Sequence, residues 1–286
     1  MRPDTDGPRR RHLAILCVVG LLLVAGCGGA AGPDTANETV TDGTVTDGTT
    51  TETGAAVDSL PAAAFPPGVT AAGVQNETQL LGAHRQALLR TPGTIRTTTN
   101  MTLADRSFRT QTTTVATAGV DRIRYEARGA GDLGNNHSRT ETIIYGNATN
   151  VTQRVTADGE VQLANVRGRA ELFERAFVGF ATATSPIRGL LTRGGEFRVV
   201  NVTRQGETRM FTLRADSYAG DRLAAAENVT SYTATVQIAA DGGVLAASER
   251  IEGREAADFG GYRFDYRFRP GAVSPEPFVP NATVGR

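Results

Sequence analysis

The stretch Tyr262–Phe268 reads YRFDYRF and alternates aromatic with charged side chains. Neighbouring side chains of a β-strand point to opposite faces, so this pattern predicts a strand with one buried face and one face in water. The aromatic face would carry Tyr262, Phe264, Tyr266 and Phe268, and the wet face Arg263, Asp265 and Arg267. We interpret the aromatic row as core packing first and as a candidate ligand lining second.

The same period of two recurs along much of the chain on the N-terminal side of this stretch. In the segment 95–103, apolar and threonine side chains alternate with polar ones, and threonine suits strands that have one wet face. The sequences ADG at 157–159 and DGG at 241–243 are hairpin signals. We therefore expect about ten or eleven strands, all antiparallel. An open sheet of that size curls or closes.

Three segments break the alternation and predict helices. The segment 77–90 carries an apolar stripe and starts at Asn76, a residue suited to the N-cap position. A very apolar helix is expected over 169–182, and a shorter one over 187–191. The first of these two places three phenylalanines at i, i+4 and i+7: Phe173, Phe177 and Phe180.

Apolar helices need a surface to cover, and the concave face of a curled sheet supplies one. The predicted fold is therefore α+β. It is a curled antiparallel half-barrel with helices packed on its concave face, formed by a domain spanning residues 66–286.

The N-terminus has the pattern of an export signal over residues 1–26. Positive charge at Arg9–Arg11 precedes an apolar run at Leu13–Ala25, which is too short for a comfortable transmembrane helix. The run ends in Val24-Ala25-Gly26-Cys27, the lipobox pattern, in which the thiol of Cys27 accepts a lipid. An N-terminal anchor that is never cut is the alternative. Sec and twin-arginine export both fit the basic segment.

Residues 27–65 are expected to form a lipid-anchored, threonine-rich, disordered tether. The sequence TVTDG occurs twice in succession, at 39–43 and 44–48, and bulky apolar side chains are nearly absent up to residue 60. Such a stretch cannot bury enough surface to offset its ordering entropy. The tether would hold the domain on the outer face of the cell membrane, an extracytoplasmic location.

Glycosylation sequons are unusually dense. Nine of the eleven asparagines begin Asn-x-Ser/Thr without a central proline. Threonine richness raises the count, and some of these asparagines can instead cap helices or turns. The candidate sites are Asn37, Asn76, Asn100, Asn136, Asn147, Asn150, Asn201, Asn228 and Asn281.

Catalytic and metal-binding patterns are absent from the sequence. Of the three histidines, His12 leaves with the signal, His84 lies on the apolar stripe of a predicted helix, and His137 lies in a polar loop. No nucleophile–base set, paired carboxylates or metal-ligand spacing can be drawn, so we expect neither an enzyme nor a cofactor. A net charge of zero and the lack of a dominant basic patch exclude a nucleic-acid binder of the usual kind.

The sequence resembles an uncharacterised family of haloarchaeal surface lipoproteins. The resemblance is carried by the lipobox, the threonine-rich tether, the sequence AHRQAL at 83–88, and YRFDYRF before a proline-rich tail. More distantly, the order of helix, strands, helices and strands is similar to half-barrel lipoprotein carriers and mycobacterial lipid-binding lipoproteins. Those relatives hold lipid or acyl chains between sheet and helices. The resemblance thus implies a pocket near Phe173, Phe177, Phe180 and the 262–268 face.

Two hypotheses for the function remain open at this point. The first is a lipid-anchored module, attached to the membrane through Cys27, that binds an apolar ligand such as a lipid or an isoprenoid. The second is a structural, glycosylated cell-surface protein with a fully packed core and no ligand. An apolar cavity would favour the first hypothesis and a solid core the second.

Overall fold

The computed structural model describes residues 50–52, 57, 59–104, 106–131, 138–147, 151–164, 177–220, 223, 226–254 and 259–277. The predicted signal peptide, Cys27 and most of the predicted tether lie outside these residues. Within the described ranges, none of the helices has the length and apolarity that a membrane span requires.

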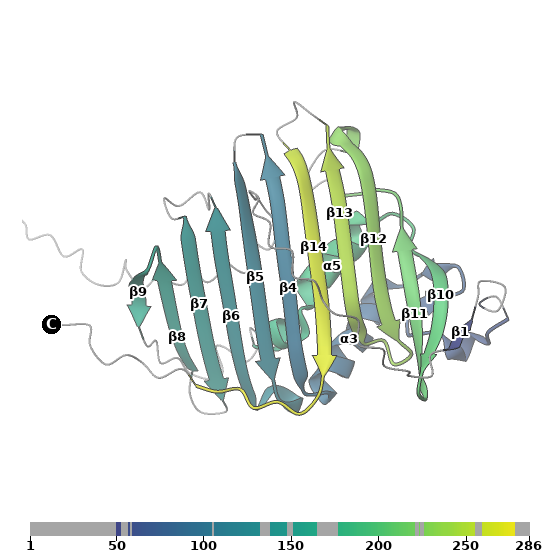
Figure 1. Cartoon of the computed structure of the whole chain (residues 1–286). Helices are drawn as coiled ribbons and strands as arrows, with labels where there is room; N and C mark the ends of the chain where they lie inside the picture. Colours follow the sequence, from purple (N-terminus) through teal and green to yellow (C-terminus); the bar gives the residue numbers. More distant parts are fainter. Residues whose placement is uncertain are drawn as a thin grey trace, which may run out of the picture.

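The fold is built on one large antiparallel sheet (Figure 1). Its twelve strands follow the order β1-β10-β11-β12-β13-β14-β4-β5-β6-β7-β8-β9, and every neighbouring pair is antiparallel. The bounds are β1 Thr50–Glu52, β4 Gly93–Leu103, β5 Ser107–Ala116, β6 Arg122–Gly131, β7 Arg139–Asn147, β8 Val151–Ala157, β9 Glu160–Ala164, β10 Arg198–Gln205, β11 Thr208–Ala215, β12 Val229–Ala239, β13 Val244–Gly253 and β14 Phe259–Pro270. A separate two-stranded sheet joins β2 (Val69–Thr70) to β3 (Gly73–Val74).

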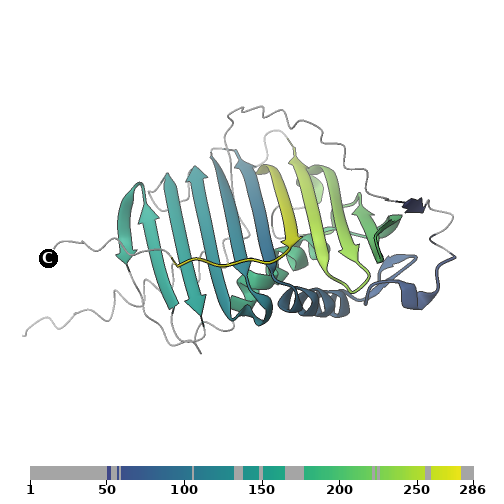
Figure 2. The ribbon, with the colours of Figure 1, turned by 60° about the horizontal axis from the view of Figure 1, so that its bottom comes forward.

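The helices lie on one face of this sheet (Figure 2). Helix α3 (Glu77–Arg90) has the predicted bounds, and the side chain of Asn76 caps it by accepting a hydrogen bond from Gln79 N–H at 2.9 Å. Helix α5 (Thr184–Arg193) is longer at both ends than the predicted 187–191. The described part of the predicted 169–182 helix starts at residue 177 and is helical. The predicted α+β fold, an antiparallel sheet curled over helices, is confirmed.

The alternation of β14 is as the sequence predicted. Tyr262, Phe264, Tyr266 and Phe268 are buried under the helices, whereas Arg263 and Arg267 on the opposite face are exposed. We call these two sides of the sheet the helix-covered face and the helix-free face.

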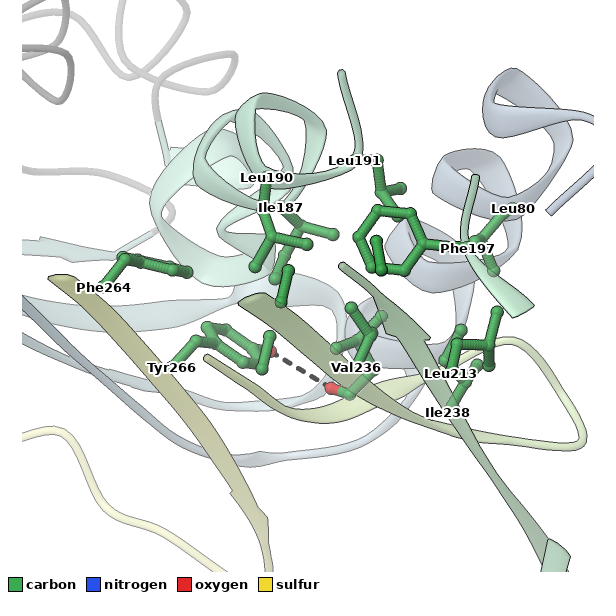
Figure 3. Packing of buried hydrophobic residues seen from close by; sticks show 14 of the residues in the cluster. Leu80, Ile187, Leu190, Leu191, Phe197, Leu213, Val236, Ile238, Phe264 and Tyr266 are labelled. Carbon is green, nitrogen blue, oxygen red and sulfur yellow. Dashed lines mark hydrogen bonds between the residues drawn. The ribbon is translucent and has the colours of Figure 1, made fainter. Parts of the chain in front are cut away.

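The larger of two hydrophobic clusters lies between α3, α5 and strands β10 to β14 with β4 (Figure 3). Leu80 of α3 and Ile187 and Leu190 of α5 are fully buried against the sheet. Phe211 of β11 and Phe264 of β14 are among the largest side chains with almost no exposure. Burial of apolar side chains on this scale is the main stabilisation of the half-barrel.

The second cluster lies over β6, β7 and β8. Phe177 packs there with Ile123, Ile144 and Val151. Its ring rests on the backbone of β7 at Gly146, where a Cβ atom would overlap the ring. The chain between residues 177 and 183 therefore covers a different part of the sheet from α3 and α5.

The folded part begins earlier than the predicted boundary at residue 66. Val57 and Phe65 are buried in the larger cluster, and the ring of Phe65 lies 5.4 Å from that of Phe211. Thr50–Glu52, inside the predicted tether, pairs with β10 as the edge strand β1. Apart from this short edge strand the sheet has eleven strands, which agrees with the predicted ten or eleven. The sequence did not indicate these contacts, because single apolar residues in a polar stretch give no periodic signal.

His84 ties α3 to two other elements of the core. Its Nδ1 accepts a hydrogen bond from Val244 N–H at 3.1 Å, so its Nε2 carries the proton and donates to the Thr182 carbonyl at 2.7 Å. The Tyr266 hydroxyl donates to the Val244 carbonyl at 3.2 Å. Val244 lies where the register of β12 and β13 shifts, so these two side chains satisfy backbone groups that the ladder leaves free.

His84 should make the protein less stable in acid. Burial lowers the pKa of His84 from 6.5 to about 4, although the Thr182 hydrogen bond and the charge of Asp241 act in the opposite direction. The unfolded chain then takes up this proton more readily than the folded one. The stabilisation that neutral His84 provides is therefore complete above pH 6.5 and is lost as the pH falls toward 4. The free energy of unfolding should fall by on the order of 3 kcal/mol over this range.

Urea unfolding between pH 7 and pH 4 measures this loss. The variant His84→Gln is less stable at neutral pH, and the difference between wild type and variant should shrink as the pH falls. A difference that stays constant over this range would contradict the assignment.

Candidate functional site

A strip of small side chains crosses the helix-covered face between the two clusters. We call it the threonine strip; it consists of Thr97, Thr99, Thr110, Thr112, Ala127 and Gly129. Cross-strand register brings Thr97, Thr112 and Ala127 into one row and Thr99, Thr110 and Gly129 into the next. All six residues are half-buried. The strip therefore lies partly out of water, although neither cluster includes it.

Taller side chains border the threonine strip. On one side, Tyr266 stands opposite Thr97 and Phe264 opposite Thr99. At one end Tyr125 stacks on Phe180 with ring centroids 4.1 Å apart, and burial raises the pKa of Tyr125 to about 12. At the other end, Met101 faces Phe108 across β4 and β5. Short side chains thus form the sheet surface here, with aromatic and apolar ones around them.

The hydroxyls of the strip are partly engaged with one another. The Oγ1 atoms of Thr97 and Thr112 are 2.7 Å apart and share a hydrogen bond. When hydroxyls pair in this way, the threonine methyl groups remain to contact an apolar neighbour. The strip offers hydroxyl and methyl groups and no titratable side chain, an arrangement that suits binding.

A buried ion pair in the larger cluster was missed by the sequence analysis. Arg193, at the end of α5, contacts both carboxylate oxygens of Glu249 on β13, with Nε 2.9 Å from Oε1. The Tyr232 hydroxyl donates to the same oxygen at 3.2 Å, and the Arg193 guanidinium lies 5.0 Å from the centre of the Tyr262 ring. Burial raises the pKa of Glu249, while the hydrogen bonds and charge of Arg193 favour the carboxylate.

The sequence alternation around Glu249 indicates that this side chain lies on the buried face of its strand. Ala247, Glu249 and Ile251 alternate along β13 and all point under the helices. A charged side chain in that register needs a buried partner. Nothing in the local sequence identifies Arg193 as that partner, because it comes from a helix 56 positions away. Gly220 leaves room for Arg193, since a Cβ there would lie 2.8 Å from its Cγ.

The structure separates the predicted pocket residues into two groups. Tyr262, Phe264, Tyr266 and Phe268 belong to the larger cluster, under α3 and α5. Phe177 and Phe180 belong to the second cluster, and Phe173 lies outside the described residues. The threonine strip lies between the two groups, so the sequence named residues of both flanking clusters but not the strip itself.

The predicted modification sites are only partly described. Asn100, Asn147, Asn201 and Asn228 are half-buried at strand positions or strand ends, and Asn76 is exposed but serves as the N-cap of α3. Cys27, Asn37, Asn136, Asn150 and Asn281 lie outside the described residues. Within the described part of the chain, no three His, Cys, Asp or Glu side chains are placed to hold a metal ion.

The likeness of this chain to known proteins is weak. No family model matches the chain, and no curated protein matches it either. The chain is similar to the crystal structure of LprF from Mycobacterium bovis, with 11% sequence identity and a TM-score of 0.37. The match covers 72% of this chain and 97% of that one. The fold assignment rests on the strand pairing described above and not on this likeness.

Removing one partner of the Arg193–Glu249 pair should destabilise the protein, whereas replacing both partners with apolar residues should not. Arg193→Met leaves a buried carboxylate without its partner and should lower the free energy of unfolding by about 3–5 kcal/mol. The double variant Arg193→Met/Glu249→Leu replaces both charges with apolar groups and should recover most of that loss. Urea unfolding of wild type, both single variants and the double variant measures the coupling. Additive single losses would show that the pair acts through separate partners.

Proposed function

We propose that the chain is an exported, lipid-anchored cell-surface protein that binds an apolar ligand, such as a lipid or an isoprenoid, between its sheet and its helices. The observation that carries the proposal is the threonine strip. It is a half-buried row of short side chains on the helix-covered face, and Tyr266, Tyr125 and Phe180 stand at its borders.

The chemistry of the strip fits an acyl or isoprenoid chain. An apolar chain lying there would contact threonine methyl groups beneath it and aromatic rings beside it, which is favourable in proportion to the apolar area removed from water. Apolar pockets with few polar groups are the usual form of such sites. The threonine hydroxyls that are not paired with each other could orient the polar end of an amphiphile.

Membrane attachment through Cys27 completes the proposal. The apolar run Leu13–Ala25 followed by Gly26-Cys27 supports export and lipidation. A carrier or receptor for an apolar ligand benefits from this attachment, because its ligand is concentrated in the membrane. The sequons outside the helix-covered face would place sugars away from the ligand.

A structural role without a ligand is the second candidate. The dense packing of α3 and α5 on β10 to β14 favours it, since Tyr262, Phe264, Tyr266 and Phe268 are each at most 7% exposed. In that case the strip would be an ordinary, imperfectly filled part of the sheet. The two candidates differ in whether the purified protein carries a ligand.

Filling the threonine strip should abolish ligand retention. Thr112→Phe places a large ring in the middle of the strip, and overpacking there should lower the free energy of unfolding by only about 1–3 kcal/mol. Native mass spectrometry of the full chain, purified from its own host in mild detergent, reports the bound ligand. Wild type should carry a discrete apolar mass that is released on denaturation, and Thr112→Phe should not.

The neighbouring residue supplies a matched control. Thr113→Phe makes the same change on the same strand but on the helix-free face, opposite Arg96, and should keep the ligand. Thr110→Leu is a milder version of the test if Thr112→Phe fails to fold. An identical ligand mass in wild type, Thr112→Phe and Thr110→Leu would show that the ligand binds elsewhere and would contradict the threonine strip as its site. No ligand in wild type would favour the structural role.

Loss of the lipid-accepting thiol should release the protein from the membrane. In the variant Cys27→Ser the chain cannot be lipidated, so membrane fractionation of the host should move it from the membrane to the soluble or secreted fraction. The intact mass of the wild type should exceed the mass of the sequence from residue 27 by that of the lipid. Unchanged fractionation of Cys27→Ser would contradict lipid anchoring.

A further inference from the structure

The helix-free face carries three pairs of arginines that stand directly opposite each other on neighbouring described strands. They are Arg198–Arg214, Arg250–Arg263 and Arg96–Arg267. Side chains opposite each other in antiparallel strands lie about 5 Å apart at Cβ, and like charges there are destabilising. Folding alone gives no reason to keep such pairs.

Two of the three pairs are neutralised locally. Arg198 pairs with Glu196 at 3.3 Å, and Arg214 pairs with Asp216 at 2.7 Å. In the second pair, Arg250 Nε lies 3.0 Å from Glu252, and Arg263 Nε lies 2.9 Å from Asp265. Each of these four arginines thus has a carboxylate two residues away along the chain.

The pair Arg96–Arg267 has no such compensation. Thr94 and Thr98 flank Arg96 on its side of β4, and Asp265, the one acid flanking Arg267, is engaged by Arg263. Both arginines are exposed, and neither takes part in an ion pair with the described residues. Arg109, Arg139 and Arg269 share this state and the same face. Arg269 lies two residues from Arg267 on β14. Arg109 and Arg139 lie four residues along the strands from the Arg96–Arg267 row, beyond a row that holds Asp265 and the ion-paired Arg128 and Glu141. We call these five residues the arginine face.

We propose that the arginine face docks on the surface of an anionic phospholipid bilayer. The uncompensated arginines spread from β14 to β7, so a single small anion could engage only one or two of them and would remain in water. A surface of many phosphates engages several of them at once, beside the C-terminal segment that Arg124 holds on this face through the Glu276 carbonyl. Each arginine near such a surface contributes on the order of 1 kcal/mol. The guanidinium group matches phosphate oxygens in geometry.

The predicted tether is long enough for the lipid anchor and the arginine face to reach the same membrane surface. The inference rests on the membrane attachment through Cys27 proposed above. As the flexible coil that its composition predicts, the stretch 28–49 would span about 23–28 Å. Strand β1, where this stretch enters the sheet, is five strand spacings from β14, or about 24 Å. The lipid anchor and the arginine face can therefore meet the same membrane plane.

Docking and glycosylation exclude each other at Asn100. This residue lies on the helix-free face between Arg263 of β14 and Arg109 of β5. A glycan there would hold the face away from a flat surface. The proposal therefore requires an unmodified Asn100, and peptide mapping that finds a glycan at Asn100 would overturn it.

Arginine footprinting of the full chain on vesicles tests the docking. The protein is reconstituted into phosphatidylcholine vesicles with or without phosphatidylglycerol, treated with phenylglyoxal, and mapped by mass spectrometry. Labelling of Arg96, Arg109 and Arg267 should fall several-fold only on the anionic vesicles, and high salt should restore it. The exposed helix residues Arg85 and Arg188 should label equally on both.

Matched double variants distinguish the effect of the arginine face from the effect of overall charge. Arg96→Gln/Arg267→Gln should lose the protection of Arg109 and Arg269, whereas Arg85→Gln/Arg188→Gln removes the same charge from the helices and should keep it. Equal labelling on both vesicle types would overturn the proposal. So would protection on phosphatidylcholine alone, which would mean that the acidic stretch 28–49 covers the face.

Two further experiments distinguish a failure of the docking proposal from a failure of the proposed lipid anchoring. Protection by inorganic phosphate without anionic lipid would reveal a discrete phosphate site and overturn surface docking. Flotation with phosphatidylcholine vesicles tests attachment independently of the arginines. A chain that floats with unprotected arginines contradicts the docking, and a chain that does not float contradicts the proposed anchoring.

Discussion

The pairing of β14 with β4 is the constraint on which the rest of the fold depends. The last strand of the chain runs beside the first long one and pairs with it from Phe259 opposite Leu103 to Pro270 opposite Gly93, with one register shift between Phe259 and Gly261. Without this seam, the strands β10 to β13 and the strands β5 to β9 would be two separate sheets. Contacts between residues so far apart in sequence carry a high loop-closure cost. The aromatic row buried along β14 offsets that cost, because it brings the largest side chains to the seam.

The helix layer follows from this seam but is not uniform. Helices α3 and α5 cover the aromatic row and the strands beyond it, while the chain at 177–183 covers β6 to β8. Two buried polar contacts hold these pieces in place. His84 joins α3 to β13 and to Thr182, and Arg193 joins α5 to Glu249. Where neither helical piece is centred, the sheet carries threonine, alanine and glycine, which is why the candidate ligand site falls there.

The sequence could predict the elements whose apolar side chains repeat over a few residues. The alternation of β14 and the stripe of α3 repeat within a few residues, so their strand, helix and burial assignments hold in the structure. Arg193 and Glu249 could not be paired, because their contact depends on how α5 crosses the sheet. For the same reason, the sequence could not show that Phe177 and Tyr266 belong to separate clusters. The apolar character of a residue does not show which part of a wide sheet it covers.

Alternation along one strand links the two proposed surfaces. In YRFDYRF the aromatic residues bury one face of β14, and the arginines between them necessarily point to the other. The strand that closes the core therefore also supplies Arg267 to the arginine face, and Tyr266, its neighbour, borders the threonine strip. A ligand under the helices and a membrane on the opposite face would be separated by the thickness of a single sheet. Because strand pairing fixes both faces at once, a change in the register of β14 would displace the ligand border and the arginine pair together.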